Sequence, residues 1–159
     1  MKYKFDFDTQ YNQFYIIDKL SDAKTDSDDF WTELAHKERL AVSDSSLIGI
    51  RTESYGHING EMMILEKANE IVDTIKYDHI VEGGLNLKSG ILQILDCPMN
   101  DLQLELKLHP GKYRIRIYSE NLDSVLETDS YDDFDDHYKI EIWPDDDMDR
   151  KVLKIYSRK

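Results

Sequence analysis

The feature that most constrains the fold is a two-residue alternation of apolar and polar side chains that recurs along most of the chain. Leucines occupy every second position from Leu102 to Leu108, and the next run places Tyr113, Ile115 and Ile117 on one face. Successive side chains of a β-strand point to opposite faces, so each run has one face suited to a core and one suited to water. The alternation therefore predicts antiparallel strands buried on one side.

Similar runs recur at fairly regular spacing, and turn residues separate them. The predicted strands are residues 4–8, 13–18, 47–52, 61–66, 79–87, 90–96, 102–108, 112–119, 138–144 and 151–156. Many short strands are typical of a sandwich or barrel, and the long crossover helices that parallel strands need are missing between these runs. The sequence HPGK at 109–112 predicts a turn that joins two of the strands, 102–108 and 112–119, as a hairpin. Gly49, Gly56 and Gly60 predict turns and a bulge.

A change of period marks one helix in the N-terminal third. In the run FWTELAHKERLAV, Phe30, Leu34 and Leu40 are apolar and charged residues lie between them. Capping residues and acids precede this run, which the helix dipole favours. The pattern predicts a helix over about 29–41. The predicted fold is therefore mainly β, an antiparallel β-sandwich with this one helix, and a length of 159 residues fits a single domain over 1–159.

Charge excludes two classes of function. The chain carries 33 Asp and Glu against 20 Lys and Arg, a net charge of −13. A protein that binds nucleic acid needs a basic surface to neutralise phosphates, and anionic lipids also attract Lys and Arg, so we expect neither partner. No apolar run approaches the ~18 residues that span a bilayer, and the N-terminal residues are not apolar like a signal peptide. We therefore expect a cytoplasmic protein.

No catalytic motif is present. The five histidines form no HExxH motif, and Ser54 is not in a GxSxG motif. Cys97 is the single cysteine, which excludes a CxxC pair and an intrachain disulfide, and we interpret it as an ordinary core or turn residue. The sequence therefore predicts no enzyme, no cofactor and no metal.

The negative charge is concentrated in one segment, residues 129–149, which we call the acidic block. It contains ten Asp and Glu residues and Lys139 as its only basic residue. A predicted strand divides it into a first acidic loop, 130–136, and a second acidic loop, 144–149. Strand geometry predicts that the two loops lie at opposite ends of that strand.

Three interpretations of the acidic block remain open. Charge runs are most often solvated loops. Calcium binding is the second interpretation. An EF-hand is excluded, because a loop counted from Asp129 or from Asp145 has no Gly at position six and no Glu at position twelve. The third is a basic protein partner, since carboxylates interleaved with aromatic rings give both a steering field and anchors. A nuclease is such a partner, because its cleft is positive. The residues predicted to bind it are Asp129, Tyr131, Asp132, Asp133, Phe134, Asp135, Asp136, Asp145, Asp146 and Asp147.

Five segments resemble a family of small bacterial proteins related to competence protein J. They are FWTELAHKERLAV, LIGIRTESYG, YDHIVEGGLNLKSGILQILDCP, PGKYRIRIYSENL and YKIEIWP, and the resemblance covers about residues 12 to 156. Members of that family accompany a secreted or membrane-associated nuclease and inhibit it, and similar small β proteins act as immunity proteins beside toxins. The resemblance implies a nuclease inhibitor or immunity protein, and from the acidic block we expect it to occlude a basic active-site cleft.

Two alternatives stay open. A rival acidic surface surrounds the start of the predicted helix, at Asp22, Asp26, Asp28, Asp29 and Glu33. The other alternative is a β-sandwich module that binds a small ligand or carbohydrate, with Trp31, Tyr55 and Trp143 as stacking surfaces. A deep apolar pocket with converging polar groups would favour that module.

Overall fold

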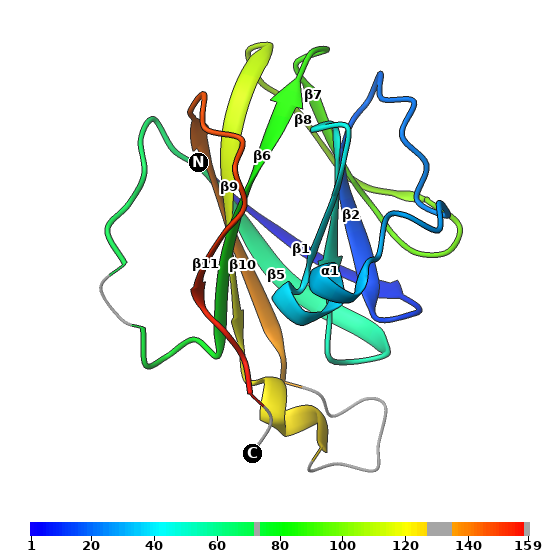
Figure 1. Cartoon of the computed structure of the whole chain (residues 1–159), viewed down its shortest axis with the longest axis vertical. Coiled ribbons are helices and arrows are strands. Elements are labelled where there is room, and N and C mark those ends of the chain that lie inside the picture. The colour runs from blue at the N-terminus through cyan, green and yellow to red at the C-terminus, as the bar shows by residue number, and fades with distance from the viewer. Residues whose placement is uncertain (72–73, 127–134, 158–159) are drawn as a thin grey trace.

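Two β-sheets pack face to face in the computed structural model, which describes residues 1–71, 74–126 and 135–157 (Figure 1). The six-stranded sheet has the order β1 (Lys2–Thr9), β5 (Gly56–Ile64), β10 (His137–Pro144), β9 (Gly111–Glu120), β6 (His79–Leu87) and β11 (Lys151–Lys154). The five-stranded sheet has the order β3 (Leu40–Ser43), β4 (Leu47–Arg51), β2 (Gln13–Asp18), β7 (Ile91–Leu95) and β8 (Leu102–Lys107). The predicted mainly β fold is confirmed. Neighbouring strands are antiparallel except β5 and β10, which are parallel.

The main core lies between the two sheets, where the predicted alternation places its apolar faces. The six-stranded sheet contributes Ile117 and Ile140 and the five-stranded sheet contributes Ile16 and Ile48, each at most 1% exposed. Complete burial of such a side chain stabilises the fold by about 1.5–3 kcal/mol relative to exposure. A second apolar cluster lies beneath the chain that crosses the outer face of the five-stranded sheet, and includes Phe30.

The helix is shorter than predicted. Helix α1 spans Glu33–Glu38, begins after the cap Thr32, whose side chain accepts a hydrogen bond from the Ala35 amide, and ends at Arg39 with φ of 61°. The predicted range of 29–41 is wrong at both ends because its apolar residues serve other elements. Phe30 packs in a turn under the helix, and the residues from Leu40 on pair with β4 as the strand β3.

The predicted hairpin of 102–108 with 112–119 is also wrong. Strand β8 pairs with β7 in one sheet, whereas β9 lies between β6 and β10 in the other. Both strands direct apolar side chains, among them Leu106 and Ile115, into the same core from opposite sheets. The HPGK turn therefore crosses between the sheets. Alternation fixes the face that a strand buries, but not the strand that it pairs with.

Strand β5 begins earlier than predicted and runs through Gly60 without a break. A Cβ atom at Gly60 would lie 2.1 Å from the Tyr138 carbonyl oxygen and 2.4 Å from the Phe5 ring, so this position has no room for a side chain. Gly49 also lies within a strand, β4, where a Cβ atom would meet the Trp31 ring at 2.8 Å. The two glycines therefore allow close packing, and the predicted turns at these positions are wrong.

Candidate functional site

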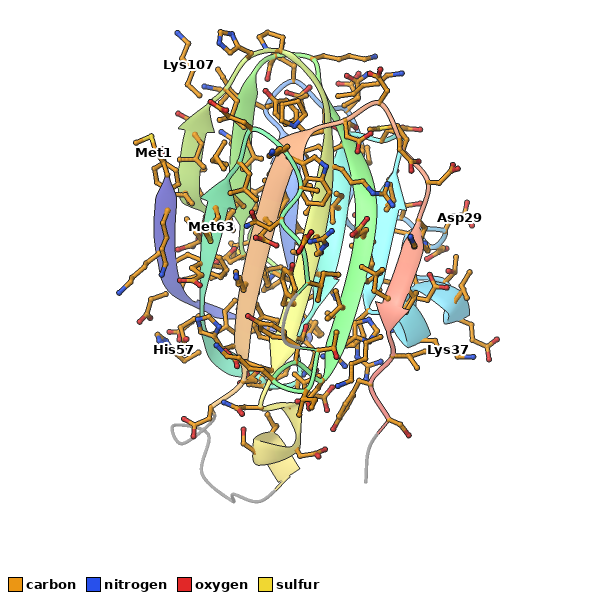
Figure 2. All side chains as sticks on the ribbon, turned by 90° about the vertical axis from the view of Figure 1, so that its left-hand side faces the viewer. Met1, Asp29, Lys37, His57, Met63 and Lys107 are labelled. Atoms are coloured by element: carbon orange, nitrogen blue, oxygen red, sulfur yellow. The ribbon has the colours of Figure 1, made fainter. Side chains whose placement is uncertain are left out.

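The described residues of the acidic block outside β10, which are 135–136 and 145–149, lie at opposite ends of that strand (Figure 1). The strand has eight residues, so the loops are separated by about 26 Å along it. A partner that contacts one loop closely therefore meets the other only if its surface extends along the whole sandwich. The end at which β10 begins also carries the 3₁₀ helix η1 (Leu122–Leu126), and Lys107 lies at the far end (Figure 2).

Half of the predicted partner-binding residues lie outside the described part of the chain: Asp129, Tyr131, Asp132, Asp133 and Phe134. Of the others in the first acidic loop, Asp135 is exposed and Asp136 is only 1% exposed. The two neighbouring aspartates therefore differ in role. Asp135 can meet a partner in this structure, whereas Asp136 belongs to the interior.

The Asp136 carboxylate joins two loops. Its Oδ2 atom accepts hydrogen bonds from the Ser54 amide at 3.0 Å and from the Tyr138 hydroxyl at 2.6 Å. The Tyr138 hydroxyl in turn accepts a hydrogen bond from the Glu53 amide at 2.7 Å. Tyr138 is fully buried, and burial together with the Asp136 charge raises the pKa of its hydroxyl well above the usual value. This network attaches residues 53–54 to the end of the first acidic loop.

Hydrogen bonds also attach the described residues just before residue 127 to the rest of the fold. The Leu122 amide donates to Asp78 at 2.8 Å, and the Tyr156 hydroxyl donates to Asp123 at 2.6 Å. The Asp135 amide donates to the Ser124 hydroxyl at 3.3 Å, which links η1 directly to the far side of 127–134. Leu122, Asp123, Ser124 and Asp135 are therefore each held by a hydrogen bond.

The second acidic loop uses part of its carboxylate groups internally. Asp145 accepts a hydrogen bond from the Asp147 amide and Asp147 accepts one from the Asp149 amide, each at 2.9 Å. The first of these bonds lowers the pKa of Asp145, with smaller contributions from Trp143 and Arg114. Asp146 is exposed and accepts no such bond among the described residues. This loop therefore offers fewer uncommitted oxygens than its composition indicates.

The rival acidic surface is exposed. Asp22, Asp26, Asp28, Asp29 and Glu33 all have exposed side chains. Asp29 and Lys37 lie at one edge of the molecule, opposite the edge that carries His57 and Met1 (Figure 2). Aromatic side chains gather nearby, because Trp31 directly follows this loop and lines two hollows of about 250 Å³, both of which also contact Tyr11.

The three aromatic residues predicted as stacking surfaces do not form one surface. Trp143 is 4% exposed on the six-stranded sheet, where its ring lies 4.9 Å from the Arg116 guanidinium group. Tyr55 is 42% exposed and packs against Tyr11, and Trp31 lies over the other sheet. The described hollows are open rather than deep, with volumes of about 250 to 490 Å³. The structure therefore does not assemble the predicted small-ligand site from these rings.

A buried charged cluster lies on the outer face of the six-stranded sheet, which faces the viewer in Figure 2. Glu82 accepts hydrogen bonds from Arg114 at 2.6 Å and from Arg116 at 2.7 Å, and all three side chains are nearly buried. Asn69 donates to Glu141 at 2.6 Å and so closes the cluster from above. Alternation places Arg114, Arg116 and Glu141 opposite the core, but it gives no signal of the contacts that Asn69 and Asp147 make with them.

Within the described ranges, no group of three or more His, Cys, Asp or Glu side chains is arranged to hold a metal ion. No helix in the same ranges has the length and apolar character needed to cross a membrane. Cys97 is buried beside Tyr15, and burial raises the pKa of its thiol, so it lacks the low pKa of a reactive cysteine.

Comparison with solved structures identifies the fold. The chain is similar to ComJ from Bacillus subtilis, an inhibitor of the DNA-degrading activity of NucA, with a TM-score of 0.68 and 17% identity over 91% of this chain and 98% of ComJ. It is also similar to the protein of crocagin biosynthetic gene J, with a TM-score of 0.54 and 15% identity over 91% and 99% of the two chains. No protein-family model and no curated protein sequence matches. The predicted resemblance to competence protein J is therefore confirmed for the fold.

Proposed function

We propose that this chain is a cytoplasmic bacterial inhibitor of a nuclease or toxin, which it binds as an acidic immunity protein without any catalysis of its own. The observation that carries the proposal is the fold shared with ComJ, since the similarity extends over nearly the whole of both chains. The net charge of −13 supports the same proposal, because it suits a basic partner and not DNA.

The proposed mechanism is occlusion of the partner's cleft. A nuclease cleft is positive because its substrate is a polyanion, so carboxylates of the first acidic loop pair there with arginine and lysine. Tyr131 and Phe134 supply the aromatic anchors that interfaces favour. Among the ten predicted residues we assign the contacts to 129–135, and we assign Asp136 a positioning role because its carboxylate is bonded internally.

The second acidic loop contributes chiefly to the long-range field in this proposal. Its Asp145 and Asp147 carboxylates already accept hydrogen bonds, and removing those bonds on binding would cost free energy. Charges that remain solvated still accelerate the approach of an oppositely charged partner. The loop therefore raises the association rate more than it lowers the dissociation rate.

The test measures degradation of linear DNA by purified nucleases in the presence of this chain, beginning with the product of any nuclease gene adjacent to its own and including NucA. We expect one of these enzymes to be inhibited at equimolar inhibitor. The triple variant Asp132→Asn, Asp133→Asn, Asp135→Asn should inhibit at least about tenfold more weakly, since loss of close charge pairs exceeds 1.4 kcal/mol.

A charge-matched control is available at the helix start. Asp22→Asn, Asp28→Asn, Asp29→Asn changes the net charge equally and should retain most of the inhibition. If this control fails while the first variant inhibits normally, the interface lies at the rival surface and our assignment is wrong. If wild-type protein inhibits none of the nucleases even at about tenfold molar excess, the proposed function is wrong.

A further inference from the structure

One hollow on the outer face of the five-stranded sheet combines aromatic rings with a carboxylate. It has a volume of about 250 Å³ and is lined by Tyr11, Gln13, Tyr15, Thr25, Asp26, Ser27, Trp31, Cys97 and Pro98. Tyr11 is 61% exposed at its rim, Tyr15 is buried at its base, and Trp31 is half-buried. Three rings therefore surround a space about the size of one long side chain.

Two of the three rings, those of Trp31 and Tyr15, are held in place before any ligand binds. Gln13 accepts hydrogen bonds at the same oxygen, Oε1, from the Trp31 indole at 2.6 Å and from the Tyr15 hydroxyl at 2.7 Å. Gly49 lies beneath Trp31 and leaves the space that the indole occupies. A ligand therefore meets rings whose orientation costs no further entropy, which is the usual advantage of a preorganised site.

Asp26 gives the hollow its charge. None of the ion pairs among the described residues involves Asp26, and its side chain is exposed. The pKa of the Tyr15 hydroxyl lies well above its usual value, chiefly because of burial and then because of Cys97, and the Asp26 charge also raises it. Asp26 itself lines the hollow, so its charge acts on groups inside it.

Aromatic faces attract cations through their quadrupole, and a carboxylate adds direct attraction. An anion would be repelled by Asp26, and a neutral sugar could donate hydrogen bonds to its carboxylate but would lack the charge attraction that a cation gains. The second hollow beside Trp31 differs, because Arg51 and His36 line it and the guanidinium group there disfavours a cation. The chemistry that suits the two sides of Trp31 is therefore opposite.

We propose that the hollow lined by Trp31 and Asp26 binds the side chain of an arginine or lysine that a basic partner protein inserts into it. The proposal deepens the proposed function and rests on it for the identity of the partner as a nuclease or toxin. It adds one contact on the rival acidic surface to those assigned to residues 129–135, in which Asp26 pairs with the cation while Tyr11 and Trp31 cover its apolar stem.

The test uses the whole chain and a small probe, and so needs no partner. The Trp31 indole N–H resonance is followed by NMR while N-acetyl-arginine amide is added, and Trp31→Phe identifies the resonance. We expect a saturating shift of the Trp31 resonance and a much smaller one of the Trp143 resonance. N-acetyl-citrulline amide has nearly the same shape without the charge, and we expect it to bind at least about threefold more weakly.

Two matched variants decide the role of the carboxylate. Asp26→Asn should weaken binding of the arginine probe at least about threefold, whereas Asp29→Asn, in the same loop but outside the lining, should leave it unchanged. Equal affinity for arginine and citrulline, no shift at Trp31, or an unchanged affinity in Asp26→Asn would each overturn the proposal.

The nuclease assay separates this proposal from the proposed function. If a nuclease is inhibited equally by wild type and by Asp26→Asn, the hollow plays no part in the complex and the proposal on the partner side chain is wrong. If the probe binds as expected but no nuclease is inhibited, the hollow binds cations and the proposed function is wrong.

Discussion

Gly60 shows how tightly single positions of the sandwich are constrained. A Cβ atom there would meet a backbone carbonyl oxygen, which cannot move without displacing β10. We expect Gly60→Ala to lower the free energy of unfolding by about 3 kcal/mol or more, at the upper end of overpacking effects. Equilibrium unfolding in urea measures the change.

Gly83→Ala is the matched control for this prediction. Its Cβ atom would approach Leu40 Cδ2 at 3.0 Å, the flexible end of a side chain, so we expect a loss of about 1 kcal/mol or less. Equal losses in the two variants would contradict the packing that the structure shows around Gly60.

His79 links pH to stability. It is fully buried, its Nε2–H group donates to the Glu38 carbonyl at 2.7 Å, and its Nδ1 atom accepts from the Tyr156 amide at 3.0 Å. Burial lowers its pKa from 6.5 to about 4, and the charges of Arg39 and Arg51 act in the same direction. Between these two values the unfolded state binds more protons than the folded state. Stability is therefore lost as the pH falls from 6.5 to 4.

The expected loss from His79 alone is on the order of 3 kcal/mol, from a pKa difference of about 2.5 units. His79→Gln retains a donor for Glu38 but does not titrate. Its unfolding free energy, measured in urea at several pH values, should fall by that much less than the wild-type value over this range. Parallel curves for the two proteins would show that the pKa of His79 is the same in the folded and unfolded states, and would contradict this prediction.

Loops of the sandwich depend on a few buried hydrogen bonds, and Tyr138 provides two of them. Tyr138→Phe removes the hydrogen bond that the hydroxyl donates to Asp136, which keeps the one from the Ser54 amide, and the hydrogen bond that it accepts from the Glu53 amide. Because both groups are buried, we expect a loss of about 2 to 3 kcal/mol in the free energy of unfolding. Urea denaturation of the single variants and of the double variant with Asp136→Asn measures the coupling.

Tyr113→Phe is the control for Tyr138→Phe. Its hydroxyl donates to the His109 carbonyl, which belongs to an exposed turn where water can replace the lost bond. We expect a loss of about 1 kcal/mol or less. A loss in Tyr138→Phe no larger than this would mean that water reaches the Asp136 network.

The sequence predicted elements better than their partners. Alternation located most strands because the period of a half-buried strand is local, whereas β8 and β9 were paired wrongly because their edges depend on distant strands. The helix was too long because Phe30 and Leu40 are apolar for reasons outside it. Likewise, nothing local distinguishes the buried Asp136 from the exposed Asp135, since the burial of Asp136 depends on Ser54.

At the scale of the whole molecule, the net charge of −13 acts before any contact forms. It should accelerate association with a basic partner by long-range attraction, which salt screens over a Debye length of about 10 Å at 0.1 M. The composition alone predicted this field. The structure adds that its sources lie at both ends of β10 and around the helix start, so the charge is not confined to one docking surface.

The salt dependence of the association rate can therefore separate direct contacts of the first acidic loop from the long-range field of the net charge. We expect the association rate constant of the wild-type chain with its nuclease to fall by about tenfold or more between about 0.05 and 0.5 M salt, measured by stopped-flow fluorescence. Asp132→Asn, Asp133→Asn, Asp135→Asn should reduce both the rate at low salt and this slope. Asp136 stays unchanged in that variant because its loss would disturb Tyr138 and confuse folding with binding.

The control Asp22→Asn, Asp28→Asn, Asp29→Asn removes the same charge, so an effect of equal size on rate and slope would mean that only net charge matters. A larger effect in the first variant, accompanied by faster dissociation, would place the first acidic loop in the contact itself.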